Sequence, residues 1–284
     1  MRMRRALVNG INLAYEVLGS GPPLLLIMGY RLNCRAWPLD FTAALAKRFT
    51  LLLFDNRGTG QSDKPTSGYA LSNIAKDICG LLDHLDVPRA HVLGYSMGGA
   101  VAQELACRHP ERVRALVLCA TLCGGPRTAY AGPAVIAVMR SLVGLSPHEA
   151  ARQIATVTYA PSYLEANREL VEQQMLREIA DSTPLHAADL QFQAFVDFDS
   201  SQALPSLATP TLVMTGDADR LIPPGNSQLI AELIRDARLV ILPGLAHRAI
   251  WESTEECARL IADFLEETQK PKDRARQEAN ANAG

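Results

Sequence analysis

The chain has 284 residues, of which 48% are hydrophobic and 20% are charged, so it has enough apolar side chains to bury a large core. Its formal net charge is -2 and its pI is near 6.3, a balance that excludes the basic surface on which nucleic-acid binding depends. We therefore expect a folded protein that acts on a small-molecule substrate and has no nucleic-acid partner. The sequence leaves its oligomeric state open.

The N-terminal segment and the cysteines bear on cellular location. Arg2, Arg4 and Arg5 precede a stretch that Asn9 and Gly10 interrupt, so we find no apolar region of a signal peptide. The apolar runs are far shorter than the ~20 residues that a membrane-spanning helix needs. We expect a cytoplasmic protein with no membrane span and with reduced thiols at its six cysteines, Cys34, Cys79, Cys107, Cys119, Cys123 and Cys257.

Short apolar runs alternate with amphipathic stretches along the chain. This order predicts an α/β fold in which parallel strands are joined by helices that cover both faces of the sheet. Before these runs, residues 6–8 and 13–17 are expected to form a hairpin that turns at Asn9-Gly10, which makes one edge of the sheet antiparallel. The expected strands that follow are residues 24–28, 50–54, 90–93, 113–119, 211–215 and 239–242.

The segments between the strands show helical patterns. Residues 71–85 carry apolar side chains at the spacing of one helix face, so this helix should pack on the sheet. Residues 124–204 lack strong strand runs, and parts of them, such as 163–179, have helical patterns. We expect 124–204 to form a helical cap inserted into an α/β core made of residues 1–123 and 205–268. The polar, alanine-rich tail 269–284 is expected to be disordered.

A candidate nucleophile follows the strand predicted at 90–93. The residues Gly94-Tyr95-Ser96-Met97-Gly98 match G-x-S-x-G, and a helical pattern follows them from 100 to 108. This strand, turn and helix context is that of a nucleophile elbow, in which a sharp turn exposes the serine hydroxyl. Glycines flank the serine because such a turn leaves no room for β-carbons. Ser96 is therefore the predicted nucleophile.

A serine hydroxyl near neutral pH needs a general base, and the base needs an acid that orients it. His247 is the predicted base because it alone of the six histidines follows a late strand, in a loop that could reach the sheet edge. The acid should follow the preceding strand, where Asp217 and Asp219 both occur. Structural or surface roles are expected for the other histidines, which are His84, His91, His109, His148 and His186.

From about residue 9 to 267, the chain resembles the α/β-hydrolase superfamily, which uses the order Ser, Asp, His along the chain. Residues 55–62 are similar to the D-x-R-G-x-G-x-S loop, which is structural in that family, so Asp55 is given no catalytic role. Residues 216–223 resemble the G-x-x-D-x-hydrophobic-hydrophobic-P segment, whose aspartate corresponds to Asp219. The resemblance thus implies a catalytic triad of Ser96, Asp219 and His247.

Two positions depart from the family pattern. Ala246 replaces the glycine of the family's G-H segment, although the downstream glutamate is present at Glu252. Met28 replaces the histidine of the common H-G-x segment, while Trp37 stands at the expected distance. In the family the oxyanion hole uses backbone N–H groups after that glycine and after the nucleophile. The donors implied here are Met97 and Tyr30, with Arg31 as the alternative to Tyr30.

The resemblance is to capped serine hydrolases such as esterases and 3-oxoadipate enol-lactonase-like enzymes. It implies cleavage of an ester, lactone or thioester through an acyl-enzyme on Ser96, with no metal and no organic cofactor. A lyase, a cyclase or a carbon–carbon bond hydrolase is the alternative, and a non-catalytic ligand-binding protein is a further one. Some cap residues could line an apolar pocket or simply form cap core: Tyr130, Met139, Tyr159, Tyr163, Phe192, Phe195 and Phe198.

Overall fold

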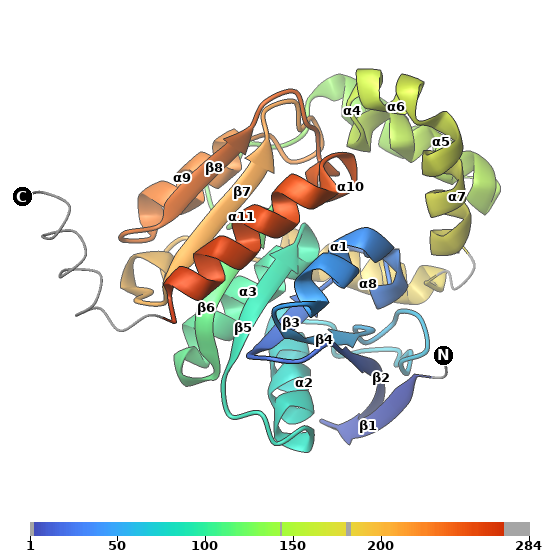
Figure 1. The fold of residues 1–284 in the computed structure, drawn as a ribbon. Helices are drawn as coiled ribbons and strands as arrows, with labels where there is room; N and C mark the ends of the chain where they lie inside the picture. Colours follow the sequence, from blue (N-terminus) through green and yellow to red (C-terminus); the bar gives the residue numbers. More distant parts are fainter. Residues whose placement is uncertain (1–2, 143, 180–182, 270–284) are drawn as a thin grey trace, which may run out of the picture.

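The apolar runs of the sequence lie side by side in one mostly parallel sheet (Figure 1). The structure is a computed structural model, and it describes residues 3–142, 144–179 and 183–269. Within these residues the sheet has eight strands in the order β1-β2-β4-β3-β5-β6-β7-β8. The strands are β1 (Arg4–Val8), β2 (Ile11–Leu18), β3 (Pro23–Ile27), β4 (Thr50–Phe54), β5 (Ala90–Tyr95), β6 (Val113–Cys119), β7 (Thr211–Gly216) and β8 (Arg238–Leu242).

The predicted hairpin and the mixed character of the sheet are confirmed. Strands β1 and β2 pair antiparallel, and β2 pairs antiparallel with β4, whereas the other neighbours are parallel. Asn9 and Gly10 join the hairpin with φ values of 46° and 78°. These are the left-handed values that a two-residue hairpin turn requires, and asparagine followed by glycine adopts them at low cost.

Helices cover both faces of the sheet (Figure 1). Helices α2 (Leu71–His84), α3 (Met97–Arg108) and α9 (Gly225–Leu233) share one apolar core with one face of the strands. Helices α1 (Leu39–Ala46) and α11 (Thr254–Glu267) form a second core on the opposite face. Every residue of β5 is buried, as expected for a central parallel strand between two helical layers. These features confirm the predicted α/β architecture.

Between β6 and β7 the regular elements of the described residues are helical. They are α4 (Pro133–Ser141), α5 (Pro147–Thr158), α6 (Pro161–Ala166), α7 (Arg168–Ile179), α8 (Leu185–Val196) and the 3-10 helix η3 (Leu204–Ser206). Proline is the first residue of α4, α5 and α6, where its missing N–H costs no hydrogen bond. In Figure 1, α4 to α7 gather beyond one end of the sheet.

The segment 163–179, which has a helical pattern, forms parts of two helices. Helix α6 ends at Ala166 and α7 begins at Arg168. Asn167 between them has φ -123°, and its side-chain amide donates to the Tyr163 carbonyl at 3.0 Å, which closes the end of α6. Shorter elements elsewhere are η1 (Cys34–Ala36), η2 (Pro110–Arg112) and α10 (Ala249–Glu252).

Two further expectations concern the membrane and the tail. No helix among the described residues has the length and hydrophobicity to cross a bilayer. The predicted disordered tail lies outside the described residues, apart from Gln269.

Candidate active site

The predicted site residues follow the carboxyl ends of neighbouring parallel strands. Ser96 follows β5, Asp219 follows β7 and His247 follows β8, while the loop from Gly29 follows β3. Because the carboxyl ends of parallel strands meet at one edge of a sheet, residues far apart in the sequence come together there. The structure brings all of these predicted residues to the same edge.

Ser96 sits in a strained turn. Its backbone has φ 55° and ψ -123°, a conformation that is costly for a residue with a side chain. Its N–H donates to the Cys119 carbonyl at 2.9 Å, and its carbonyl accepts from the Thr121 hydroxyl at 2.7 Å. The flanking glycines are required by contact: a β-carbon on Gly98 would overlap the backbone oxygen of Ile27, and one on Gly94 would overlap that of Gly98.

Replacing Gly98 by alanine is expected to lower the free energy of unfolding by about 1–3 kcal/mol, because the added methyl group must displace the end of β3. Urea denaturation measures this loss. Gly132→Ala is the matched control, since a β-carbon there meets nothing within 4 Å. Equal stability of the two variants would show that the turn has more room than the structure indicates.

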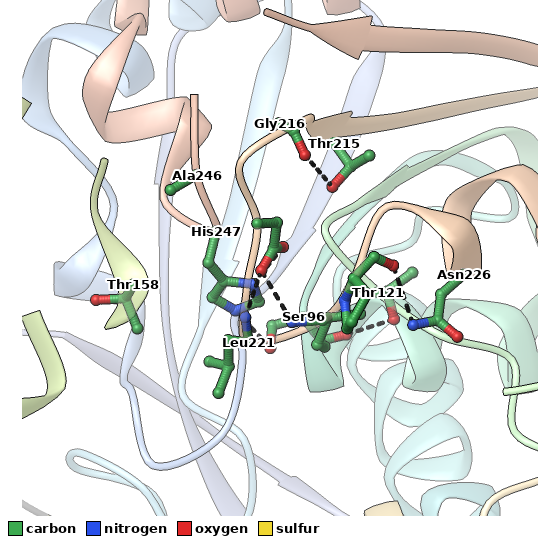
Figure 2. A network of polar contacts seen from close by, with 12 residues as sticks. Ser96, Thr121, Thr158, Thr215, Gly216, Leu221, Asn226, Ala246 and His247 are labelled. Carbon is green, nitrogen blue, oxygen red and sulfur yellow. Dashed lines mark hydrogen bonds and ion pairs between the residues drawn. The ribbon is translucent and has the colours of Figure 1, made fainter. Parts of the chain in front are cut away.

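Ser96, His247 and Asp219 form a hydrogen-bonded chain. Figure 2 shows Ser96 and His247 facing each other in this chain. The His247 Nε2 atom lies 3.2 Å from the Ser96 hydroxyl oxygen, and Nδ1 lies 2.8 Å from the Asp219 Oδ2 atom. The other carboxylate oxygen of Asp219 accepts the N–H groups of Leu221 at 2.9 Å and Ile222 at 2.8 Å. Ser96 is 9% exposed, and His247 and Asp219 are each 3% exposed. A buried carboxylate with these partners can hold one orientation of the imidazole.

The contacts in the structure distinguish the two candidate aspartates, Asp217 and Asp219. Asp217 is exposed, and its carboxylate accepts the N–H of Gly244 at 2.7 Å. Asp219, two residues later, is the one that contacts the His247 ring. The motif-based choice of Asp219 thus agrees with the contacts.

Glu252 joins the loop that carries His247 to the helical segment between β6 and β7, which we call the insertion. Its carboxylate accepts the N–H of Ala246 at 2.9 Å and the N–H of Ala160 at 2.7 Å. Burial raises the pKa of Glu252, while the two N–H groups act in the opposite direction. Alanine in place of the family's glycine at 246 is compatible with this contact, because only its backbone is used.

Sequence reasoning missed Arg248. This buried guanidinium pairs with Glu178 of α7, with N–O distances of 2.6 and 2.8 Å. It also packs against the rings of Tyr159, at 5.2 Å, and Trp251, at 4.9 Å. Burial alone would lower the pKa of Arg248, but the facing carboxylate outweighs burial and the pKa is raised. A charged residue between His247 and the apolar run at residues 249–251 was the available signal, but the partner of Arg248 is 70 residues away.

The loop after β3 lies against the serine. A β-carbon on Gly29 would be 3.0 Å from the Ser96 β-carbon. Within the described residues, the N–H groups of Met97 and Tyr30 make no hydrogen bond to another protein group. The Arg31 N–H, in contrast, donates to the Gln191 side chain at 3.2 Å, so this alternative donor is already engaged.

Met28 and Asp55 make hydrogen bonds with the segments around this loop. Met28 is buried, and its carbonyl accepts from the Asn56 side chain at 3.1 Å, so this hydrogen bond does not need the histidine of the family. The Asp55 carboxylate accepts the N–H groups of Cys34 at 2.9 Å and Gln61 at 2.8 Å. Asp55 therefore organises loops and does not contact Ser96 or His247.

The remaining candidates are spread over the molecule. His91 is buried on β5 and contacts Gln269, while His84 contacts Tyr15. Among the aromatic residues between β6 and β7, Tyr159 is buried and stacks on Tyr163 at 5.7 Å, whereas Tyr130 is 72% exposed. No cluster of three or more histidine, cysteine, aspartate or glutamate side chains suited to a metal ion occurs in the part of the chain that the structure describes.

Known proteins resemble this chain in sequence and structure. A protein of Azorhizobium caulinodans, provisionally named carbamate hydrolase RutD, is 30% identical over 238 residues, which cover 83% of this chain and 88% of that protein. A hydrolase structure from Pseudomonas aeruginosa is 32% identical with a TM-score of 0.79, covering 93% of this chain and 98% of that one. The enol-lactonase of Burkholderia xenovorans is 26% identical with a TM-score of 0.80, covering 92% and 99%. Since residues 22–254 also match the family described as alpha/beta hydrolase fold, the chain belongs to the alpha/beta hydrolase fold family.

Proposed function

We propose that this protein is a serine hydrolase that cleaves an ester, lactone or thioester bond of a small molecule through an acyl-enzyme on Ser96. The observation that carries the proposal is the buried hydrogen-bonded chain from Ser96 through His247 to Asp219. The names of the similar structures, a hydrolase and an enol-lactonase, support hydrolysis at a carbonyl.

In the proposed reaction, the Ser96 oxygen attacks the substrate carbonyl carbon while His247 Nε2 takes the hydroxyl proton. The Asp219 carboxylate stabilises the imidazolium through Nδ1. His247 then gives the proton to the leaving oxygen or sulfur, which departs and leaves an ester on Ser96. Water attacks this ester with His247 again as the base, and the acid product and free Ser96 result.

The negative charge that develops on the carbonyl oxygen needs fixed hydrogen-bond donors. We assign this role to the N–H groups of Met97 and Tyr30, the residues that follow Ser96 and Gly29, whose backbones lie close together. Loss of one such donor typically lowers kcat by ~10²–10³. We also propose that residues 124–204 act as a cap domain over residues 1–123 and 205–268, and that the cap selects the substrate.

Fluorophosphonate labelling tests the nucleophile. Intact-protein mass spectrometry is expected to show one adduct on the wild type, none on Ser96→Ala and much slower labelling of His247→Ala, because only a serine activated by its base reacts quickly. Circular dichroism checks that the variants are folded. A screen of p-nitrophenyl esters, lactones and thioesters then follows with the wild type.

Two results would contradict the proposal. An adduct of equal yield on Ser96→Ala would place the nucleophile elsewhere. Folded wild-type protein that forms no adduct and hydrolyses none of the three substrate classes would rule out this serine hydrolase mechanism.

A further inference from the structure

The loop beside Ser96 contains a turn that its own sequence does not favour. The Leu32 N–H donates to the Gly29 carbonyl at 3.3 Å, which closes a turn over residues 29–32. Arg31, the third residue of the turn, has φ 62°. Glycine or asparagine usually occupies this position in a type II turn, and the left-handed conformation costs another residue about 1–2 kcal/mol. Some other part of the protein must therefore hold Arg31 in place.

Two side chains of the 124–204 insertion hold the backbone of Arg31. The Gln191 Oε1 atom accepts its N–H at 3.2 Å, and the Thr183 hydroxyl donates to its carbonyl at 2.8 Å. Gln191 is 0% exposed and Thr183 is 4% exposed, whereas the side chain of Arg31 is exposed. The insertion thus binds both polar backbone groups of this strained residue and leaves its side chain in solvent.

The orientation of the Gln191 amide is determined by a second contact. Its nitrogen donates to the Arg57 carbonyl at 3.0 Å, so its oxygen must face Arg31. The next residue of α8, Phe192, packs its ring 6.0 Å from the ring of Tyr30. Helix α8 therefore contacts the ring of Tyr30 through Phe192 and the backbone of Arg31 through Gln191.

We propose that Thr183 and Gln191 are positioning residues that keep the 29–32 turn in the conformation that presents the Tyr30 N–H to the oxyanion. The proposal rests on the proposed function and extends it, because it assigns part of the oxyanion hole to the insertion. A donor that moves by 1 Å can cost ~10²-fold in rate, so two hydrogen bonds that fix a strained turn have a kinetic consequence.

Isosteric variants test the proposal through kinetics. Thr183→Val removes the hydroxyl with little change of shape, and Gln191→Met removes both amide contacts. Each is expected to lower kcat for a p-nitrophenyl ester by about 10-fold with KM unchanged, and the double variant should approach the ~10²–10³ loss of one oxyanion donor. Thr183→Ser keeps the hydroxyl and should keep the wild-type kcat.

Arg127→Met is the structural control. The Arg127 guanidinium lies 2.5 Å from the Glu232 carboxylate of α9, which is also a contact between the insertion and the rest of the protein, but it lies outside the 29–32 turn and the His247 loop. Its loss should leave kcat unchanged. If Arg127→Met lowers kcat as much as Thr183→Val, or if Thr183→Ser fails to preserve kcat, the proposal is wrong.

Hydrogen–deuterium exchange tests the turn without substrate. In Gln191→Met the Arg31 N–H loses its acceptor, so a peptide covering residues 28–37 should exchange faster than in the wild type and in Arg127→Met. Unchanged exchange would overturn the proposed positioning. The proposed function can fail separately. If the wild type forms no fluorophosphonate adduct but Gln191→Met still exchanges faster than the wild type, the proposed function is wrong and the contact between Gln191 and Arg31 is still supported.

Discussion

Asp219→Asn is expected to lower kcat by about four orders of magnitude while the protein stays folded. The reason lies in the N–H groups of Leu221 and Ile222, which point at one oxygen of the carboxylate. They require an oxygen acceptor, so the new amide must turn its NH₂ group toward His247 Nδ1. The histidine then carries its proton on Nε2 and cannot accept the proton of Ser96. Steady-state kinetics with a p-nitrophenyl ester measures the loss.

Asp217→Asn is the matched control. It removes the same charge two residues earlier, and its amide oxygen can still accept the N–H of Gly244. Its kcat should equal that of the wild type. A large loss in Asp217→Asn with little loss in Asp219→Asn would reverse the assignment of the acid.

Arg248→Met is expected to lower the free energy of unfolding by about 3–5 kcal/mol, because it leaves the carboxylate of Glu178 buried without its counterion. Among the described residues, only the amide of Gln174, at 2.9 Å, would still donate to that carboxylate. Urea denaturation measures the change. Glu178→Met should destabilise the protein in the same way, since it leaves the buried guanidinium unpaired.

The double variant Arg248→Met/Glu178→Met tests whether the loss of stability in each single variant comes from the partner that is left unpaired. Replacing a whole buried ion pair by apolar side chains is often close to neutral, so the double variant should be more stable than either single variant. Arg238→Met is the control at an exposed pair, where Arg238 lies 2.6 Å from Glu267, and it should cost only ~0–1 kcal/mol. Additive losses in the double variant would show that the two side chains do not stabilise each other.

Arg248 lies in the segment that carries the proposed base, so a contact that stabilises the protein also holds part of the site. It directly follows His247, and its own N–H donates to the Thr158 carbonyl of α5 at 3.0 Å. Glu252 joins the same loop to Ala160. The segment that carries the proposed base is therefore held by the insertion at several points, as is the turn that carries Tyr30.

Local sequence determined the elements that form the scaffold of the site. Apolar runs predicted the strands, since central strands such as β5 are buried on both faces, and Asn9-Gly10 predicted the hairpin, since both residues accept left-handed φ values. Gly94 and Gly98 marked the turn at Ser96 because neighbouring backbone leaves no space for a β-carbon. These signals act over a few residues, so they can be read without knowing the partner segments.

Tertiary structure alone decided how the insertion contacts the site. The sequence did not show that Glu178 would pair with Arg248, or that Thr183 and Gln191 would bind the backbone of Arg31. These contacts join positions 70 to 160 residues apart, and glutamate, threonine and glutamine are mostly exposed in folded proteins, so these residues carry no local sign of a buried contact. Only packing of the insertion against the sheet edge removes water from them, and burial turns ordinary surface residues into partners of the loops beside Ser96 and His247.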